Sequence, residues 1–131
     1  MSFSREDYLR VMYEISEEKD SIRSNDIAER MQISRPSVSQ MLKKMNGEDL
    51  TRTDPYSEVK LTRKGLARAK KMMRKHRIIE VFLKEILDYD ISKVHEEAHR
   101  LEHAFSDESI RRLNSFLDDP QLSPTNKRIP R

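Results

Sequence analysis

Three of the four histidines of this chain fall within thirteen residues, in the stretch KVHEEAHRLEHAF at positions 93–105. Its first part, HEEAH, matches H-E-x-x-H, a motif in which two histidines one helical turn apart bind zinc and the glutamate acts as a general base. The stretch therefore raises the question of whether the chain is a small metalloprotease or binds a metal ion for another purpose.

Helical spacing separates these histidines from the residues that would form a core. At about 100° per residue, five polar side chains share an arc of roughly 120°: His95, Glu96, His99, Glu102 and His103. A separate arc holds the apolar side chains Val94, Ala98, Leu101 and Phe105. A merely solvated face is the simpler alternative, but three imidazoles and several carboxylates on one stripe favour metal binding.

One ion cannot use all three histidines. His95 and His103 are eight residues apart, which is about 12 Å along a helix axis, whereas an imidazole nitrogen lies only about 2 Å from its metal. Either His95 pairs with His99, as in the protease motif, or His99 joins Glu102 and His103 and leaves His95 to a second site.

The protease alternative lacks its further ligands. The extended motif H-E-x-x-H-x-x-G-x-x-H would require glycine at Glu102 and histidine at Phe105, and no glutamate follows Glu108. We also expect no sheet edge that would hold a peptide substrate. The protease is therefore the remote alternative, and we predict that the chain is not an enzyme.

Two metal sites account for all four histidines. His76 and Glu80 have the i, i+4 spacing of a chelating pair on one helix face, and with His95 they would form one site. The other site, of His99, Glu102 and His103, still needs an oxygen or sulfur ligand, for which Asp7 is a candidate.

Composition limits the class of protein. The chain has 131 residues, 37% of them charged, and a mean hydropathy of -0.88. It has no cysteine, which excludes disulfides, cysteine-zinc sites and thiol catalysis. No apolar run approaches the roughly 20 residues of a membrane span. The opening MSFSREDYLR lacks the apolar region of a signal peptide, so we expect a cytoplasmic protein without a membrane partner.

Charge is distributed unevenly along the chain. Residues 60–77 hold nine Lys or Arg and no acid, whereas residues 79–108 hold nine Asp or Glu against three Lys or Arg. This asymmetry is typical of a nucleic-acid-binding module followed by a module of another kind. The alternative is a set of charges scattered over solvated faces.

The expected fold class is mainly α, in two parts. Helices are predicted over residues 5–18, 26–31, 35–45, 63–88, 91–104 and 107–117, with a hairpin over 51–61. Residues 1–70 would form a winged helix-turn-helix DNA-binding domain and residues 71–119 a helical dimerisation and metal-binding domain. The proline-containing residues 120–131 would form an extended C-terminal tail.

The DNA-binding prediction follows from the order helix, turn, helix, hairpin. The start of the second helix of such a unit enters the major groove, where its side chains contact base edges, while nearby cations contact phosphates. A plain three-helix bundle with a polar helix is the alternative. The candidate DNA-binding residues are Arg35, Pro36, Ser37, Ser39, Gln40, Lys43 and Lys44, with Arg52 and Lys60 in the wing.

Five segments resemble the diphtheria-toxin-repressor family of metal-dependent transcriptional repressors: DYLRVMYEI, IAERMQISRPSVSQMLKKM, LTRKG, MRKHRIIEVFL and KVHEEAHRLEHAFSDE. The resemblance implies a homodimer that binds palindromic operator DNA and takes no small-molecule substrate. It also implies a primary, activating metal site of Asp7, His99, Glu102 and His103, and an ancillary site of His76, Glu80 and His95.

Departures from the family's pattern bear on the metal. Iron-type members commonly have Met and Cys where this chain has Asp7 and His99, and manganese-type members have Glu in place of His99 and of Arg10. The family's usual glycine before the wing is replaced by Asp49, and many iron-type members continue into an SH3-like domain. The expected cofactor is a divalent transition metal, with Fe2+ favoured, Mn2+ next, and Co2+, Ni2+ or Zn2+ as substitutes in vitro. A metal-independent winged-helix regulator and a metal-buffering helical protein are the competing interpretations.

Overall fold

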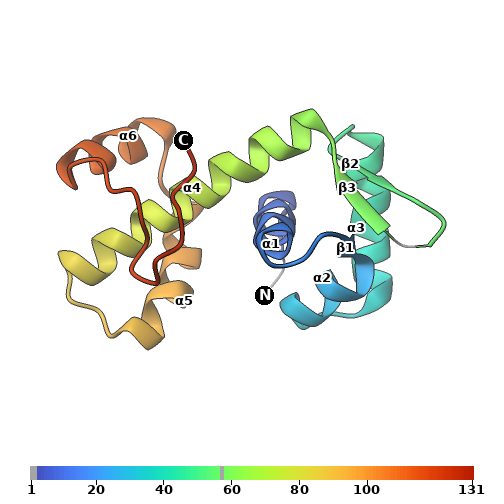
Figure 1. Ribbon diagram of the computed structural model, residues 1–131, viewed down its shortest axis with the longest axis horizontal. Coiled ribbons are helices and arrows are strands. Elements are labelled where there is room, and N and C mark those ends of the chain that lie inside the picture. Colours follow the sequence, from blue (N-terminus) through green and yellow to red (C-terminus); the bar gives the residue numbers. More distant parts are fainter. Residues whose placement is uncertain (1–2, 57) are drawn as a thin grey trace. The chain divides into compact units, whose positions relative to one another are not determined.

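The structure, a computed structural model, describes residues 3–56 and 58–131 and consists of helices with one small sheet (Figure 1). Ser57, in the expected hairpin turn, lies outside the described residues. The chain divides into two compact units, Met1–Lys70 and Lys71–Arg131. Its elements are α1 (Arg5–Glu18), β1 (Ile22–Arg23), α2 (Ser24–Met31), α3 (Arg35–Gly47), β2 (Thr51–Thr53), β3 (Glu58–Leu61), α4 (Arg63–Glu85), α5 (Ile91–Glu102) and α6 (Asp107–Phe116).

The first unit packs three helices and a three-stranded antiparallel sheet around one core. The strand order is β1-β3-β2, with Ile22 opposite Val59 and Thr53 opposite the same residue on the other side. The sequence does not predict β1, because a strand of two residues is too short to show an alternation of apolar and polar side chains. The core is formed by buried side chains that include Leu9, Met12, Ile15, Ile27, Val38, Leu42, Met45, Leu50 and Val59.

The turn between α2 and α3 has a defined geometry. Gln32 adopts a left-handed conformation with φ 55°, and the Ile33 backbone N–H donates to the Ala28 carbonyl at 3.1 Å. Ser34 then caps α3 by accepting a hydrogen bond from the Ser37 backbone N–H at 3.2 Å, which satisfies one of the open donors of the first turn. These contacts confirm the expected helix-turn-helix.

The hairpin is tied to the start of α4. Asp49, the residue that replaces the family's usual glycine, is left-handed with φ 61°. Its carbonyl accepts a hydrogen bond from the Thr62 hydroxyl at 2.6 Å, and the Thr62 backbone N–H donates to the Leu50 carbonyl at 3.1 Å. Thr62 therefore links the wing to the helix that leaves it.

The second unit has its own core, formed by the later part of α4, by α5, by α6 and by the C-terminal residues. The buried side chains are Ile78, Ile79, Val81, Leu83, Val94, Ala98, Ile110 and Ile129. Asp90 caps α5 by accepting from the Ser92 backbone N–H, and Ser106 caps α6 by accepting from that of Ser109. Among the described residues, none of the helices combines the length and the apolar character that a membrane span requires.

Two expectations for this unit need correction. Helix α4 ends at Glu85 rather than near residue 88, because Asp88 is left-handed with φ 55° and the Tyr89 backbone N–H turns back to the Leu83 carbonyl. Residues 120–131 are not an extended tail. Ser123 and Lys127 close a turn through a 2.8 Å backbone hydrogen bond, and Ile129 is buried in the core.

The two glycines of the chain offer a matched test of the wing-to-helix contact. A Cβ at Gly65 would lie 1.9 Å from the Leu50 carbonyl oxygen, whereas a Cβ at Gly47 meets nothing within 4 Å. We expect Gly65→Ala to lower the free energy of unfolding by about 3 kcal/mol through overpacking. Gly47→Ala should be neutral or stabilise α3 by up to about 1 kcal/mol. Urea denaturation followed by circular dichroism measures both, and equal effects would contradict the close approach.

Candidate functional site

The start of α3 presents a polar surface in the first unit. Val38, Leu42 and Met45 are buried and Met41 packs against the same core, whereas the polar residues of the helix face outward. All nine candidate DNA-binding residues are exposed. In the wing, Arg52 lies directly opposite Lys60 in the β2–β3 register, which places two cations side by side on one strand pair. This surface has the composition that contacts to bases and phosphates require.

A second cluster joins α4 and α5 within the second unit. His76 and Glu80 come from α4, one turn apart, and His95 comes from α5. The His76 Nε2 lies 3.1 Å from His95 Nδ1 and 3.4 Å from Glu80 Oε2, while His95 Nδ1 is 3.7 Å from the same carboxylate oxygen. The structure thus brings together the three residues predicted for the ancillary site.

The spacing of these three atoms suits a transition-metal ion. Ligand atoms bonded at about 2.1 Å lie about 3.0–3.4 Å from one another in octahedral or tetrahedral geometry, close to the separations found here. Two imidazoles and one carboxylate form a borderline nitrogen and oxygen donor set. The His95 side chain is 60% exposed, which leaves one side open to solvent and further ligands.

The electrostatics of the cluster favour an ionised Glu80. Burial raises the pKa of this carboxyl, but its interactions with the His76 and His95 imidazoles outweigh burial and hold the pKa at about 2, below its ordinary 4.5. Glu80 is therefore charged at neutral pH, the state that metal binding requires.

Glu102 has a partner that the sequence did not reveal. Its Oε1 lies 3.0 Å from the His76 Nδ1, and both side chains are buried, at 0% and 2% exposure. The predicted primary site instead grouped Glu102 with His99 and His103. The structure therefore places Glu102 in contact with the His76 cluster, and its role in the primary site stays a prediction.

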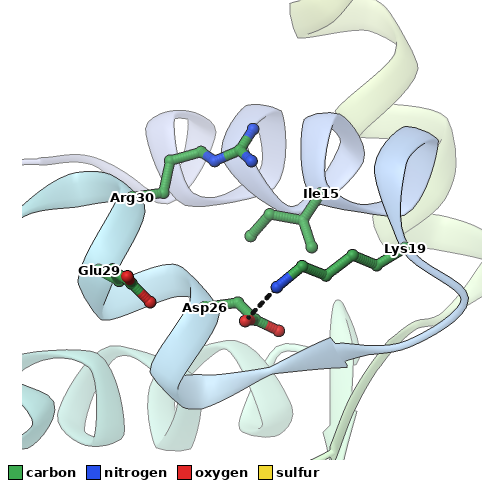
Figure 2. Close-up of a pocket in the computed structure, with 5 residues that line it drawn as sticks. All are labelled: Ile15, Lys19, Asp26, Glu29 and Arg30. Atoms are coloured by element: carbon green, nitrogen blue, oxygen red, sulfur yellow. Dashed lines mark hydrogen bonds and ion pairs between the residues drawn. The ribbon is translucent and has the colours of Figure 1, made fainter.

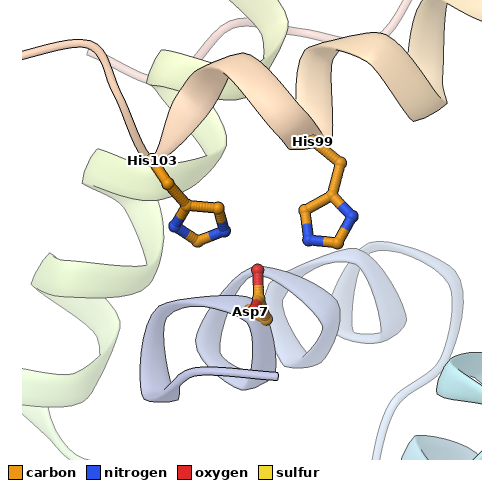
Figure 3. A group of neighbouring side chains, drawn as sticks. All are labelled: Asp7, His99 and His103. Atoms are coloured by element: carbon orange, nitrogen blue, oxygen red, sulfur yellow. The ribbon is translucent and has the colours of Figure 1, made fainter. Parts of the chain in front are cut away.

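The remaining predicted ligands are His99 and His103 in the second unit and Asp7 in the first. Figure 3 shows the rings of His99, from α5, and of His103, which follows it by one turn. Their centroids are 5.6 Å apart. Asp7, also labelled there, lies in the first turn of α1, where its Oδ2 accepts hydrogen bonds from the backbone N–H and hydroxyl of Ser4. Asp7 thus has a capping role in the first unit, and its place in a metal site remains a prediction.

The HEEAH motif divides between these two clusters. His95 contacts His76 and Glu80, whereas His99 pairs with His103. Glu96, which would be the general base of a protease, instead accepts an ion-pair hydrogen bond from Arg100 at 3.1 Å. The sequence therefore matches the protease motif, but its two histidines do not form a protease site.

A pocket of about 270 Å³ in the first unit is lined by Ile15, Lys19, Asp26, Glu29 and Arg30 (Figure 2). Lys19 and Asp26 form a 2.9 Å ion pair across it, and Arg30 pairs with Glu18. Because these charges are neutralised by neighbouring side chains, we assign no ligand to the pocket.

Family models match both units. Residues 1–59 match the iron-dependent repressor N-terminal DNA-binding domain, and residues 62–131 match the iron-dependent repressor metal-binding and dimerisation domain. The chain belongs to the iron-dependent repressor family. The resemblance expected from the sequence is thereby confirmed, as is the fold class of a helical protein with these two domains.

Individual relatives include both long and short members of this family. The diphtheria toxin repressor of Corynebacterium efficiens is 44% identical over 123 residues, 94% of this chain and 54% of the relative. The chain thus spans about half the length of this relative. An uncharacterized HTH-type transcriptional regulator of Methanocaldococcus jannaschii is 40% identical over 119 residues, 90% of this chain and 95% of the relative.

Manganese regulators are among the solved structures that resemble this chain. The manganese regulator SloR aligns with a TM-score of 0.88 at 44% identity, covering 100% of this chain and 61% of SloR. A manganese-dependent transcriptional repressor in complex with manganese aligns with a TM-score of 0.91 at 34% identity, covering 98% and 59%. Similarity therefore extends to relatives named for either metal.

The Glu80 contacts predict that the stability of the metal-free protein depends on pH. Because the folded pKa, about 2, is below the ordinary 4.5, ionised Glu80 stabilises the fold above pH 4.5, and this contribution is lost as pH falls from 4.5 towards 2. Wild type should therefore be more stable than Glu80→Gln at pH 5, with the gap closing at lower pH. Urea midpoints in EDTA measure this, with Glu96→Gln, at an exposed residue of α5, as the control. A gap that does not change with pH would contradict it.

Proposed function

We propose that this chain is a metal-dependent transcriptional repressor that acts in the cytoplasm as a homodimer on palindromic operator DNA. The proposal rests on the presence of two surfaces in one chain. The first unit exposes a helix start suited to the major groove, and the second holds a two-histidine, one-carboxylate cluster with metal-ligand spacing. Membership of the iron-dependent repressor family supports combining them in one function.

The proposed DNA-binding role rests on the exposed surface of α3. The Gln40 amide would donate to and accept from an adenine edge, and Ser37 and Ser39 would reach bases or phosphates. Lys43 and Lys44, with the wing cations, would contact the backbone and release counterions. A dimer would place two copies of α3 in successive major grooves, so that operator symmetry follows protein symmetry.

The proposed activating site draws ligands from both units. We assign Asp7 from the first unit, and His99, Glu102 and His103 from the second. A bound divalent cation would accept lone pairs from these side chains. Because the ligands belong to two units, holding them together restricts the positions that the units adopt and populates the conformation that binds DNA. His76, Glu80 and His95 would form the ancillary site.

The ligand atoms limit which metal ions the site would bind but do not select one. The proposed primary set has two nitrogens and two carboxylates, which suits Fe2+ or Mn2+, while Co2+, Ni2+ and Zn2+ would bind at least as tightly in vitro. Arg10 stands where manganese-type members use a glutamate, and its guanidinium is ion-paired with Glu14. That cation disfavours a manganese-type two-ion cluster, so we favour Fe2+, with Mn2+ next.

The proposal predicts that activation of operator binding by metal requires the His99 side chain. Fluorescence anisotropy with a labelled operator should show strong binding with Fe2+ or Mn2+ and weak binding in EDTA. His99→Ala should lose at least tenfold of the metal-activated affinity, because a ligand of the activating site is removed.

Glu96→Gln is the matched control, since it changes an exposed residue on the same helix that no proposed site uses. It should bind like wild type, whereas a zinc protease would lose its cleavage activity. Equal operator binding in metal and in EDTA would identify a metal-independent regulator and overturn the proposal.

Base reading and phosphate contact are separable in α3. Gln40→Ala should cost about 1–3 kcal/mol on the operator and relax the preference at one base pair. Lys43→Gln should weaken operator and unrelated DNA alike and reduce the slope of log affinity against log salt by about 1. Competition binding at several salt concentrations measures both. A Gln40→Ala protein that keeps full specificity would remove this residue from base recognition.

A further inference from the structure

The His76 imidazole is bonded on both sides. Its Nδ1 lies 3.0 Å from the Glu102 carboxylate, and its Nε2 faces His95 and Glu80 at 3.1 and 3.4 Å. Only 2% of its surface is exposed, and none of Glu102. The carboxylate therefore touches the ring on the side away from the atoms that would hold an ion.

This arrangement selects one tautomer of the ring. Carboxylates, which offer only acceptors, lie on both sides of the ring, Glu102 at 3.0 Å from Nδ1 and Glu80 at 3.4 Å from Nε2. The shorter contact places the His76 proton on Nδ1, which leaves the lone pair on Nε2. A neutral imidazole binds a metal through such a lone pair, and a carboxylate behind it fixes ring orientation and raises ligand basicity.

Other carboxylates of α5 do not take this role. Glu97 accepts a hydrogen bond from the Tyr89 hydroxyl at 3.0 Å, and Glu96 pairs with Arg100. Glu80 lies on the Nε2 side of the ring. Glu102 is the α5 carboxylate within hydrogen-bond distance of His76 Nδ1.

We propose that Glu102 is a positioning residue for the His76, Glu80 and His95 site, and that it links this site to the one built around His99 and His103. The inference rests on the metal sites of the proposed function and adds a shared residue to them. Loss of Glu102 then weakens both sites, whereas loss of His99 weakens one.

The substitution Glu102→Gln tests this link with little change in shape. An amide presents either an acceptor or a donor to Nδ1, so it supports both tautomers and removes the selection. Co2+ titration, followed by visible absorption and calorimetry, is carried out on the His99→Ala variant of the 131-residue chain, in which the primary site is disabled. There, Glu102→Gln should lower the remaining affinity 10- to 100-fold, the usual effect of losing such a partner.

Glu96→Gln in the same His99→Ala protein is the control and should leave the titration unchanged. An affinity that Glu102→Gln does not alter would assign Glu102 to the His99 site alone and overturn the proposal. Absence of any Co2+ signal that depends on His76 would overturn it as well. Neither result involves DNA, so metal-independent operator binding would refute the proposed function separately.

A second measurement tests the tautomer directly, first in the wild type. Nitrogen-15 NMR of histidine side chains in metal-free wild type should show His76 as the Nδ1–H tautomer at neutral pH. Glu102→Gln should shift it to a mixture, while a merely structural role for Glu102 would leave the tautomer unmoved. A wild-type ring protonated on Nε2 instead of Nδ1 would contradict the inference even if the variant failed to fold.

Discussion

The buried contact between His76 and Glu102 is the constraint around which the second unit is organised. Burying a histidine and a carboxylate is costly unless each satisfies the other, so α4 and α5 must meet at the register in which these two side chains face each other. The apolar contacts between the helices, with Ile78 and Ile79 on one side and Val94 and Ala98 on the other, are compatible with that register. Packing and polar pairing therefore specify the same alignment, and the alignment in turn brings His95 to His76.

The same register explains how the polar stripe of α5 divides. Taking His95 as the origin, at about 100° per residue Glu102 lies at about -20°, His99 at about 40° and His103 at about 80°. His95 and Glu102 therefore share the side that meets His76, and the other two histidines lie further round the helix. Treating the whole arc of roughly 120° as one face is too coarse. The finer angles are present in the sequence, but the partner of Glu102, 26 residues earlier in the chain, is not.

The sequence was sufficient for features that depend on neighbouring residues. Ser4, Ser34 and Ser106 mark helix starts through local hydrogen bonds, and the apolar spacing identifies the buried faces, so helices and the winged helix-turn-helix followed from the pattern. What it could not supply depends on distant segments. Strand β1 exists only because β3 lies beside it, and α4 ends early because Tyr89 returns to Leu83. Asp7 has a capping role that spacing alone cannot separate from a ligand role.

Only part of the basic run at residues 60–77 belongs to the DNA-binding unit. Its last four cations, Lys71, Arg74, Lys75 and Arg77, belong to the second unit. Lys71 pairs with Asp107, and Lys75 donates to the Phe105 carbonyl. The two arginines donate to the Pro130 and Arg128 carbonyls. These cations hold α6 and the C-terminal residues against α4, which is why a proline-containing segment without apolar periodicity folds onto the core. The cations that hold this packing begin at Lys71, within α4. They are therefore separate from the cations of the first unit that we propose to contact DNA.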